Sequence, residues 1–196
     1  ARFIAGTDAE SALPQIRTLW DQDMAFSVDL LGEACVSDAE AVAYQARYMD
    51  LVEKLPAEVS QWPDKPLLDR DHLGVIPRTN VSIKISSLYA RTDPIDTAGS
   101  IDGLVEALAP ILKAAEKKNV LVNFDMEHEA IKDLTLELFM RCCDDFDFTA
   151  GLAMQAGIGV SGGGGYQHQA GDVTVDNQSA AEVDGANGGR GACESD

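Results

Sequence analysis

The stretch VSIKIS at residues 81–86 decides the fold class of this chain. Its apolar and polar side chains alternate, and successive side chains of a β-strand point to opposite faces of the sheet. The valine and isoleucines are therefore expected to face covering helices, and the polar residues, Lys84 among them, to face the interior of the fold. A lone lysine in a strand more often faces solvent, but helices on the surface of a parallel sheet leave it little solvent to face.

Three further segments have strand character, at residues 25–31, 120–124 and 151–155. Helical patterns occupy residues 10–22, a segment beginning at Ser37, a segment beginning at Ser100, and residues 128–142. Strands that alternate with helices of this length predict βαβ units and a parallel sheet. We therefore predict an α/β fold, an incomplete parallel (βα)8-type (TIM-like) barrel with about the first four strands.

Some local features of these elements can be predicted as well. Ser37 and Glu40 form a capping-box pattern at the start of the first long helix. The residues expected on its inward face are Val42, Ala46, Met49 and Val52. Pro110 is expected to kink or interrupt the second long helix. Residues 56–77, which contain several prolines, are expected to form a loop.

The composition changes after Ala156. Residues 157–196 contain eleven of the 17 glycines, no leucine and one basic residue. Such a segment cannot bury enough apolar surface to offset the entropy lost on ordering. We therefore divide the chain into a partial barrel, residues 1–156, and a Gly-rich acidic tail, residues 157–196, predicted to be disordered. The tail opens with a GxGxxG pattern at residues 157–162, but no helix pattern follows to hold a pyrophosphate, so a dinucleotide site is the weakest alternative.

The charge balance excludes several classes of function. The chain has 15 basic and 33 acidic residues, a net charge of −18, which argues against nucleic-acid binding and against docking on an anionic membrane. No apolar run is long enough to span a bilayer. The four cysteines show no disulfide framework, which favours a reducing, cytoplasmic location. The three histidines show no metal-binding spacing, so no metal site is expected.

Ionisable residues gather at the predicted carboxyl ends of the strands, where barrel enzymes carry their catalytic groups. Lys84 lies on the polar side of its strand, while Asp125 and Glu33 follow the ends of two others. A buried ammonium needs a carboxylate partner, which Asp125, Asp29 or Glu33 could supply. We therefore predict Lys84, Asp125 and Glu33 as catalytic residues, although Glu33 could equally be a carboxylate at the start of a helix.

Five segments, in order, also resemble successive motifs of a known family. They are FSVDLLGEA (26–34), NVSIKISSLYAR (80–91), VNFDMEHEA (122–130), LTLELF (134–139) and GLAMQA (151–156). They resemble proline dehydrogenase, in particular the proline dehydrogenase domain of bifunctional proline utilisation A proteins. No single motif is decisive, but five in the same order are specific.

The resemblance implies a flavoenzyme that oxidises L-proline to pyrroline-5-carboxylate. Hydride would pass from the proline ring to N5 of FAD, and the electrons to a quinone. By the same resemblance, Lys84 helps hold the substrate carboxylate and Asp125 lies beside substrate and flavin. Gln155 matches a glutamine that hydrogen-bonds the flavin ring, and Glu33 a glutamate that pairs with an arginine of the last barrel helix.

The motifs that resemble the family end at residue 156, so the resemblance covers the amino-terminal half of the barrel. The later half of the family's barrel supplies further flavin contacts and arginines for the substrate carboxylate. We therefore expect a truncated homologue that binds flavin weakly or not at all by itself. The alternative is a non-catalytic remnant or interaction fragment. Peripheral membrane association is expected only through the full-length parent.

Overall fold

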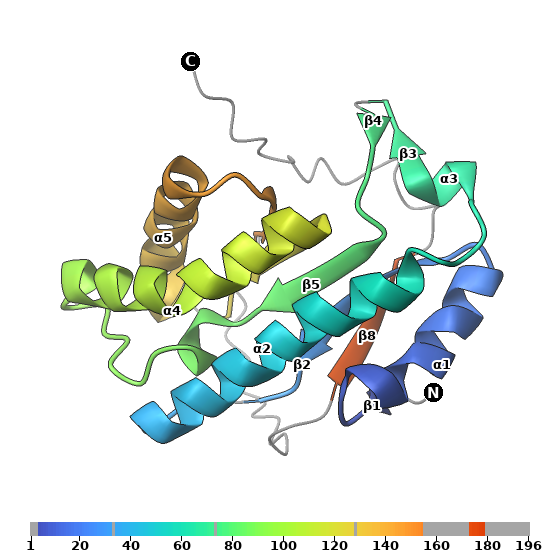
Figure 1. The fold of residues 1–196 in the computed structure, drawn as a ribbon. Helices are drawn as coiled ribbons and strands as arrows, with labels where there is room; N and C mark the ends of the chain where they lie inside the picture. Colours follow the sequence, from blue (N-terminus) through green and yellow to red (C-terminus); the bar gives the residue numbers. More distant parts are fainter. Residues whose placement is uncertain (1–3, 33, 73, 128, 155–172, 179–196) are drawn as a thin grey trace, which may run out of the picture.

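A computed structural model of the chain describes residues 4–32, 34–72, 74–127, 129–154 and 173–178. Its centre is a six-stranded sheet with the order β1-β8-β2-β5-β6-β7. Strands β1, β8, β2 and β5 are labelled in Figure 1. The strands are β1 (Ile4–Gly6), β2 (Ala25–Leu30), β5 (Thr79–Ile83), β6 (Val120–Asp125), β7 (Thr149–Ala153) and β8 (Val173–Gln178). From β2 to β7 the neighbouring strands are parallel, which confirms the predicted α/β fold with a parallel sheet.

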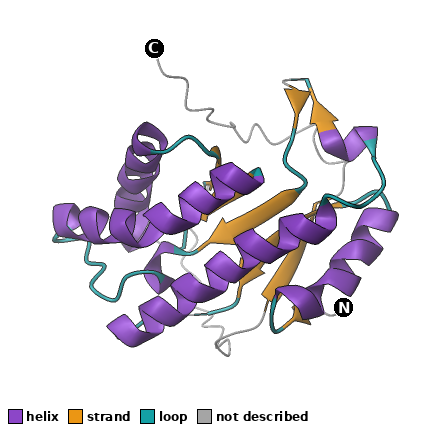
Figure 2. Ribbon diagram, in the orientation of Figure 1, coloured by secondary structure: helices purple, strands orange, loops and turns teal. Residues whose placement is uncertain are grey.

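Long helices cover one face of this sheet (Figure 2). They are α1 (Ala9–Asp21), α2 (Asp38–Val59), α4 (Thr97–Lys118) and α5 (Lys132–Asp145), and each contacts the next. The strand residues fully or almost fully buried beneath them include Phe26, Val28, Val81, Ile83, Val122 and Phe124. Burying a side chain of this size contributes about 1.5–3 kcal/mol. The apolar half of each alternating strand pattern is thus used by the helices, and the polar half belongs to the other face.

The strand β5 ends earlier than predicted. It stops at Ile83, and a short 3-10 turn, η1 (Ile85–Ser87), follows in place of further strand. Lys84 therefore stands at the exit of β5 rather than inside it. The reason is a set of competing hydrogen bonds, because the N–H of Lys84 donates to the hydroxyl of Tyr48 and its carbonyl accepts from Ser87.

The helix α2 begins after Ser37, as predicted, and the Ser37 hydroxyl accepts the N–H of Glu40. The predicted inward face is wrong for Val42, which is 61% exposed, and for Ala46, while Val52 is buried as expected. The buried stripe consists of Ala41, Tyr44, Tyr48, Leu51, Val52, Leu55 and Val59. Two tyrosines in this stripe bury more area than Val42 and Ala46 could, and they set the rotation of the helix.

The other two predicted helix limits also shift. α4 begins at Thr97, capped by Asp96, rather than at Ser100, and it continues past Pro110 to Lys118. Pro110 therefore does not end the helix, because the buried residues on either side of it hold the chain helical. α5 begins at Lys132, after a short 3-10 turn, η2 (Glu129–Ile131). No helix in the described part of the chain is long and apolar enough to cross a membrane.

Residues 56–77 contain more structure than the predicted loop. α2 extends through Pro56, and a short helix, α3 (Pro66–Asp69), leads into a hairpin of β3 (Arg70–Asp71) and β4 (Gly74–Val75). Prolines are tolerated here because they stand in the last turn of one helix and at the start of another.

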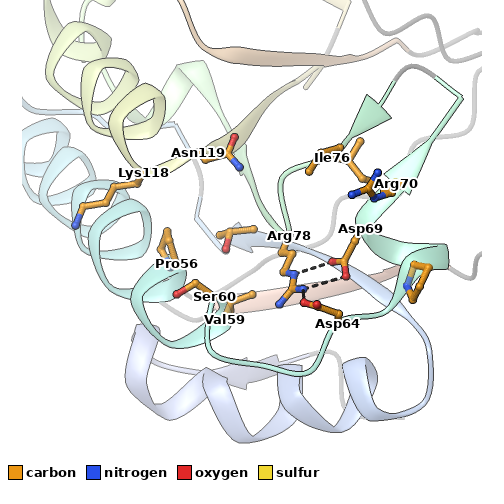
Figure 3. Close-up of a pocket in the computed structure, with 13 residues that line it drawn as sticks. Pro56, Val59, Ser60, Asp64, Asp69, Arg70, Ile76, Arg78, Lys118 and Asn119 are labelled. Carbon is orange, nitrogen blue, oxygen red and sulfur yellow. Dashed lines mark hydrogen bonds and ion pairs between the residues drawn. The ribbon is translucent and has the colours of Figure 1, made fainter.

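Arg78 fastens this segment to the body of the fold. Its guanidinium donates two hydrogen bonds to Asp69, at 2.6 and 2.9 Å, and one to Asp64 (Figure 3). It donates a further one to the carbonyl of Trp62. It also lies 5.2 Å from the ring centre of Trp20. A cavity of about 570 Å³ opens beside it at the start of β5, the end of the strand opposite Lys84.

The strand β8 differs from the disorder expected across residues 157–196. It pairs antiparallel with β2 along its whole length and also with β1. Its sequence begins with three consecutive β-branched residues, VTV, and the edge of β2 offers unpaired backbone groups that such a segment can satisfy. The rest of that tail lies outside the described residues, and the proposed domain boundary at residue 156 stays a prediction.

Candidate functional site

The ammonium of Lys84 lies between two carboxylates. Its Nζ contacts Asp29 and lies 3.3 Å from Oδ2 of Asp125. The side chains of Lys84 and Asp29 are only 20% and 15% exposed, whereas that of Asp125 is 34% exposed. The cluster is therefore shielded on the side of Asp29 and open toward solvent on the side of Asp125.

The pairing register explains why these three side chains meet. Across the sheet, Asp29 stands opposite Ser82, Ser82 opposite Asn123, and Asn123 opposite Gly151. These residues form one row on the face away from the helices, and the Asn123 carboxamide donates to the Ser82 hydroxyl at 3.0 Å. Asp125, the last residue of β6, and Lys84, the residue just past β5, come two positions after Asn123 and Ser82, on the same face and at the carboxyl ends of the strands.

The electrostatics of the cluster keep Lys84 charged. Burial is the largest single influence and lowers the pKa of Lys84, but the charge and hydrogen bond of Asp29, followed by those of Asp125, outweigh it. The net effect raises the pKa above its ordinary value. Lys84 is therefore a fixed positive charge at neutral pH and is not suited to act as a base.

Three chain segments meet at the turn that follows Lys84. The carboxylate of Glu127, just past β6, accepts the N–H of Ser86 at 3.0 Å and also its hydroxyl. The N–H of Cys35, past β2, donates to the Ser86 carbonyl at 3.0 Å. The exits of β2, β5 and β6 are thereby tied together around the cluster.

The structure brings together two of the predicted catalytic residues, Lys84 and Asp125. It adds Asp29, which the sequence suggested only as a possible partner, although its position on the polar side of β2 was the signal. Glu33 and Gln155 lie outside the described residues, as does the GxGxxG pattern. Within the described residues, no group of three or more histidine, cysteine, aspartate or glutamate side chains is arranged to hold a metal ion.

This arrangement can be compared with known proteins. The model of the family described as "Proline dehydrogenase" matches residues 12–184 of the chain. The chain belongs to the proline dehydrogenase family. The resemblance drawn from the five sequence motifs is confirmed.

Several characterised relatives are similar over most of the chain. Proline dehydrogenase 2 of Bacillus subtilis is 30% identical over 70% of this chain, and proline dehydrogenase of Deinococcus radiodurans is 31% identical over 74%. The bifunctional protein PutA of Escherichia coli is 26% identical over 81%. The matches span 38%, 40% and 11% of these relatives, so the chain corresponds to less than half the length of each.

Solved structures show the same relationship. Proline utilization A (PutA) from Bdellovibrio bacteriovorus, inactivated by N-propargylglycine, superposes with a TM-score of 0.74 at 37% identity. That match covers 79% of this chain and 16% of the larger protein. PutA from Corynebacterium freiburgense gives a TM-score of 0.61 at 25% identity, over 79% of this chain and 14% of that protein.

Proposed function

We propose that this chain carries the amino-terminal half of a (βα)8 barrel and part of the substrate site of an FAD-dependent proline dehydrogenase. The reaction is the oxidation of L-proline to pyrroline-5-carboxylate. The observation that supports this most is the position of the Lys84 ammonium, held between Asp29 and Asp125 at the carboxyl ends of parallel strands, in a chain of this family.

The donors and acceptors of the cluster suit a zwitterionic amino acid. An ammonium has three N–H donors, and the two aspartates take two of them, so one remains for the carboxylate of proline. Asp125 is the more exposed aspartate and can accept from the secondary ammonium of the same ligand. Lys84 and Asp125 would thus orient proline by two charge-assisted hydrogen bonds of opposite polarity.

The residues beside the cluster fit a flat ring system. A Cβ atom added to Gly151 would lie 2.9 Å from Oδ1 of Asn123, and the next residue on this face of β7 is an exposed alanine, Ala153. The face beside Asn123 and Asp125 therefore carries little side-chain bulk. When bound, FAD would accept the hydride from the proline ring at N5 and pass the electrons to a quinone. Asp125 and Gln155 are the residues of this chain that we assign to holding it.

The second candidate function is a non-catalytic remnant or interaction fragment of such an enzyme. One observation favours it. β8 lies along the edge of β2, where a closed parallel barrel would place its last strand, and it runs in the opposite direction. If β8 keeps this position, the barrel cannot close by the usual route.

Thermal unfolding with and without L-proline separates the two candidates. A ligand that binds only the folded state at 100 times its dissociation constant stabilises it by about 2.7 kcal/mol, which raises the Tm by roughly 5 °C or more. Under our proposal, L-proline produces this shift and D-proline a smaller one. The absence of any L-proline shift in the 196-residue chain would favour the non-catalytic alternative.

A matched pair of variants sharpens the measurement. Lys84→Met should abolish the shift caused by L-proline. Lys65→Met is the control, because Lys65 is also only 18% exposed and also pairs with an aspartate, Asp23, far from the cluster. It should lower the Tm but keep the shift. Flavin absorbance that co-purifies with the chain in stoichiometric amounts would contradict the expectation of weak flavin binding.

A further inference from the structure

The phenol of Tyr48 contacts the backbone of Lys84 from beneath the sheet. Tyr48 lies on α2, its side chain is fully buried, and its hydroxyl oxygen accepts the N–H of Lys84 at 3.1 Å. The ring alone would fill the same space in the core. The hydroxyl therefore needs partners in this apolar setting, and it has two, the N–H of Lys84 and the hydroxyl of Ser87.

The other backbone group of Lys84 is held as well. Its carbonyl accepts the hydroxyl of Ser87 at 2.7 Å and the N–H of Ser87 at 3.2 Å. The register between β5 and β6 ends one residue earlier, at Ile83 opposite Phe124. Lys84 has therefore left the sheet ladder, and a buried backbone group without a new partner would be costly at this point. Tyr48 and Ser87 supply the two partners.

These contacts fix where the Lys84 side chain begins. Its backbone is extended, with φ −105° and ψ 113°, and from there the side chain reaches carboxylates on both neighbouring strands. If the N–H lost its acceptor, the peptide would turn toward another one and carry the Cβ away from the midpoint between Asp29 and Asp125. Burial, followed by the charge of Asp29, raises the pKa of Tyr48, so its hydroxyl remains neutral at that N–H.

We propose that Tyr48 is a positioning residue, whose hydroxyl holds the exit of β5 so that the Lys84 ammonium lies between Asp29 and Asp125. Its consequence for proline binding rests on the proposed function. Its consequence for the placement of the ammonium does not, because the contacts lie within the chain itself. The two consequences can be measured separately.

The test replaces Tyr48 with phenylalanine, which keeps the ring and removes the hydroxyl. The first readout is the hydrogen-exchange rate of the Lys84 ammonium, observed by NMR through its 15N signal in mildly acidic solution and assigned by its loss in Lys84→Arg. In the unaltered chain the two carboxylates should slow this exchange, because both contact the ammonium. Tyr48→Phe should speed it roughly tenfold, the scale of one lost hydrogen bond. An unchanged rate in a folded Tyr48→Phe chain would overturn the inference.

Tyr44→Phe is the matched control, because Tyr44 is a buried tyrosine one turn earlier on the same helix. It should leave the exchange of the Lys84 ammonium unchanged, and an equal acceleration would show that any lost phenol has this effect. Ser87→Ala removes the hydroxyl that contacts both the carbonyl of Lys84 and the phenol of Tyr48. It should also speed the exchange, and it decides the question if Tyr48→Phe does not fold.

The second readout is the affinity for L-proline, which should fall roughly tenfold in Tyr48→Phe and not in Tyr44→Phe. If the unaltered chain does not bind L-proline, the proposed function fails, while the ammonium exchange still decides the role of Tyr48. If it binds L-proline with equal affinity in both variants and the exchange rates are equal too, the positioning role is refuted and the proposed function stands.

Discussion

Replacing Lys84 with methionine should destabilise the fold by about 3 kcal/mol, close to the lower limit for breaking a buried ion pair. The change leaves Asp29, which is 15% exposed, facing Asp125 without a cation between them. The cost should not reach the upper limit of about 5 kcal/mol, because Asp125 is one-third exposed and water can screen it.

A double-mutant cycle separates this effect from lost packing. Asp29→Asn should cost about 1–2 kcal/mol, less than Lys84→Met, since Asp125 still neutralises the ammonium. The double variant should be more stable than Lys84→Met alone, because it no longer places two carboxylates side by side. The coupling energy should therefore be about 2 kcal/mol, within the range for residues in direct contact.

The assay is urea unfolding at neutral pH, followed by the fluorescence of the buried Trp20 and Trp62. Lys132→Met serves as the control, because Lys132 pairs with Glu129, which is 87% exposed, and an ion pair screened by water in this way contributes little to stability. If Lys84→Met is no more costly than Lys132→Met, the ammonium is not held by the two aspartates, and the site described above is wrong.

Three further changes test other parts of the structure. Arg78→Leu should cost about 3 kcal/mol and expose the β3–β4 hairpin to limited proteolysis, because it leaves the carboxylate of Asp69 without a cation; resistance equal to that of the unaltered chain would show that Arg78 does not fasten this segment. Gly151→Ala should cost about 1 kcal/mol in urea unfolding by displacing the Asn123 carboxamide, and a neutral result would show that the row has room to adjust. The pKa of Tyr48 is raised in the folded state, so the folded chain keeps the phenol proton at a pH where the unfolded chain loses it, above the ordinary tyrosine pKa of 10.0. The contribution of Tyr48 to folding stability is therefore fully present below pH 10 and is lost as the pH rises above it. Tyr48→Phe should flatten that alkaline decline in urea midpoints, and an equally steep decline would assign it to other groups.

The features that the sequence predicted depend on local periodicity. The alternation in VSIKIS placed Lys84 on the polar face of its strand, and the same alternation placed Asp125 beside it. Both positions follow from the two-residue repeat of a strand and from the parallel order of βαβ units. The cap at Ser37 was equally local, since a hydroxyl three residues before Glu40 needs no tertiary contact to be recognised.

The features that the sequence missed depend on contacts between distant residues. The end of β5 at Ile83 depends on the hydroxyl of Tyr48, 36 positions earlier than Lys84 in the chain. The rotation of α2 depends on which side chains bury the most area. Tyr44 and Tyr48 face the core, and Val42 faces solvent. The pairing of β8 with β2 required knowing that the edge of β2 is available to a distant segment. The contacts of Tyr48 with Lys84 and of β8 with β2 leave no periodic signal. The buried stripe of α2 does repeat at helical spacing, so its rotation follows from the sequence once the two tyrosines are counted as buried.

The central position of the Lys84 cluster in the sheet determines how often its backbone is exposed by local unfolding. Asp29, Lys84 and Asp125 belong to β2, β5 and β6, or to the residue just past one of them, while the edges of the described sheet are β1 and β7. Local opening of a sheet starts at its edges, so the amides around the cluster should exchange only in the largest unfolding events. That protection extends to Asp29 because β8 makes β2 an interior strand. The six residues of β8 thus decide whether the amides around Asp29 lie in the part of the fold that exchanges hydrogen most slowly or in the part that exchanges it fastest.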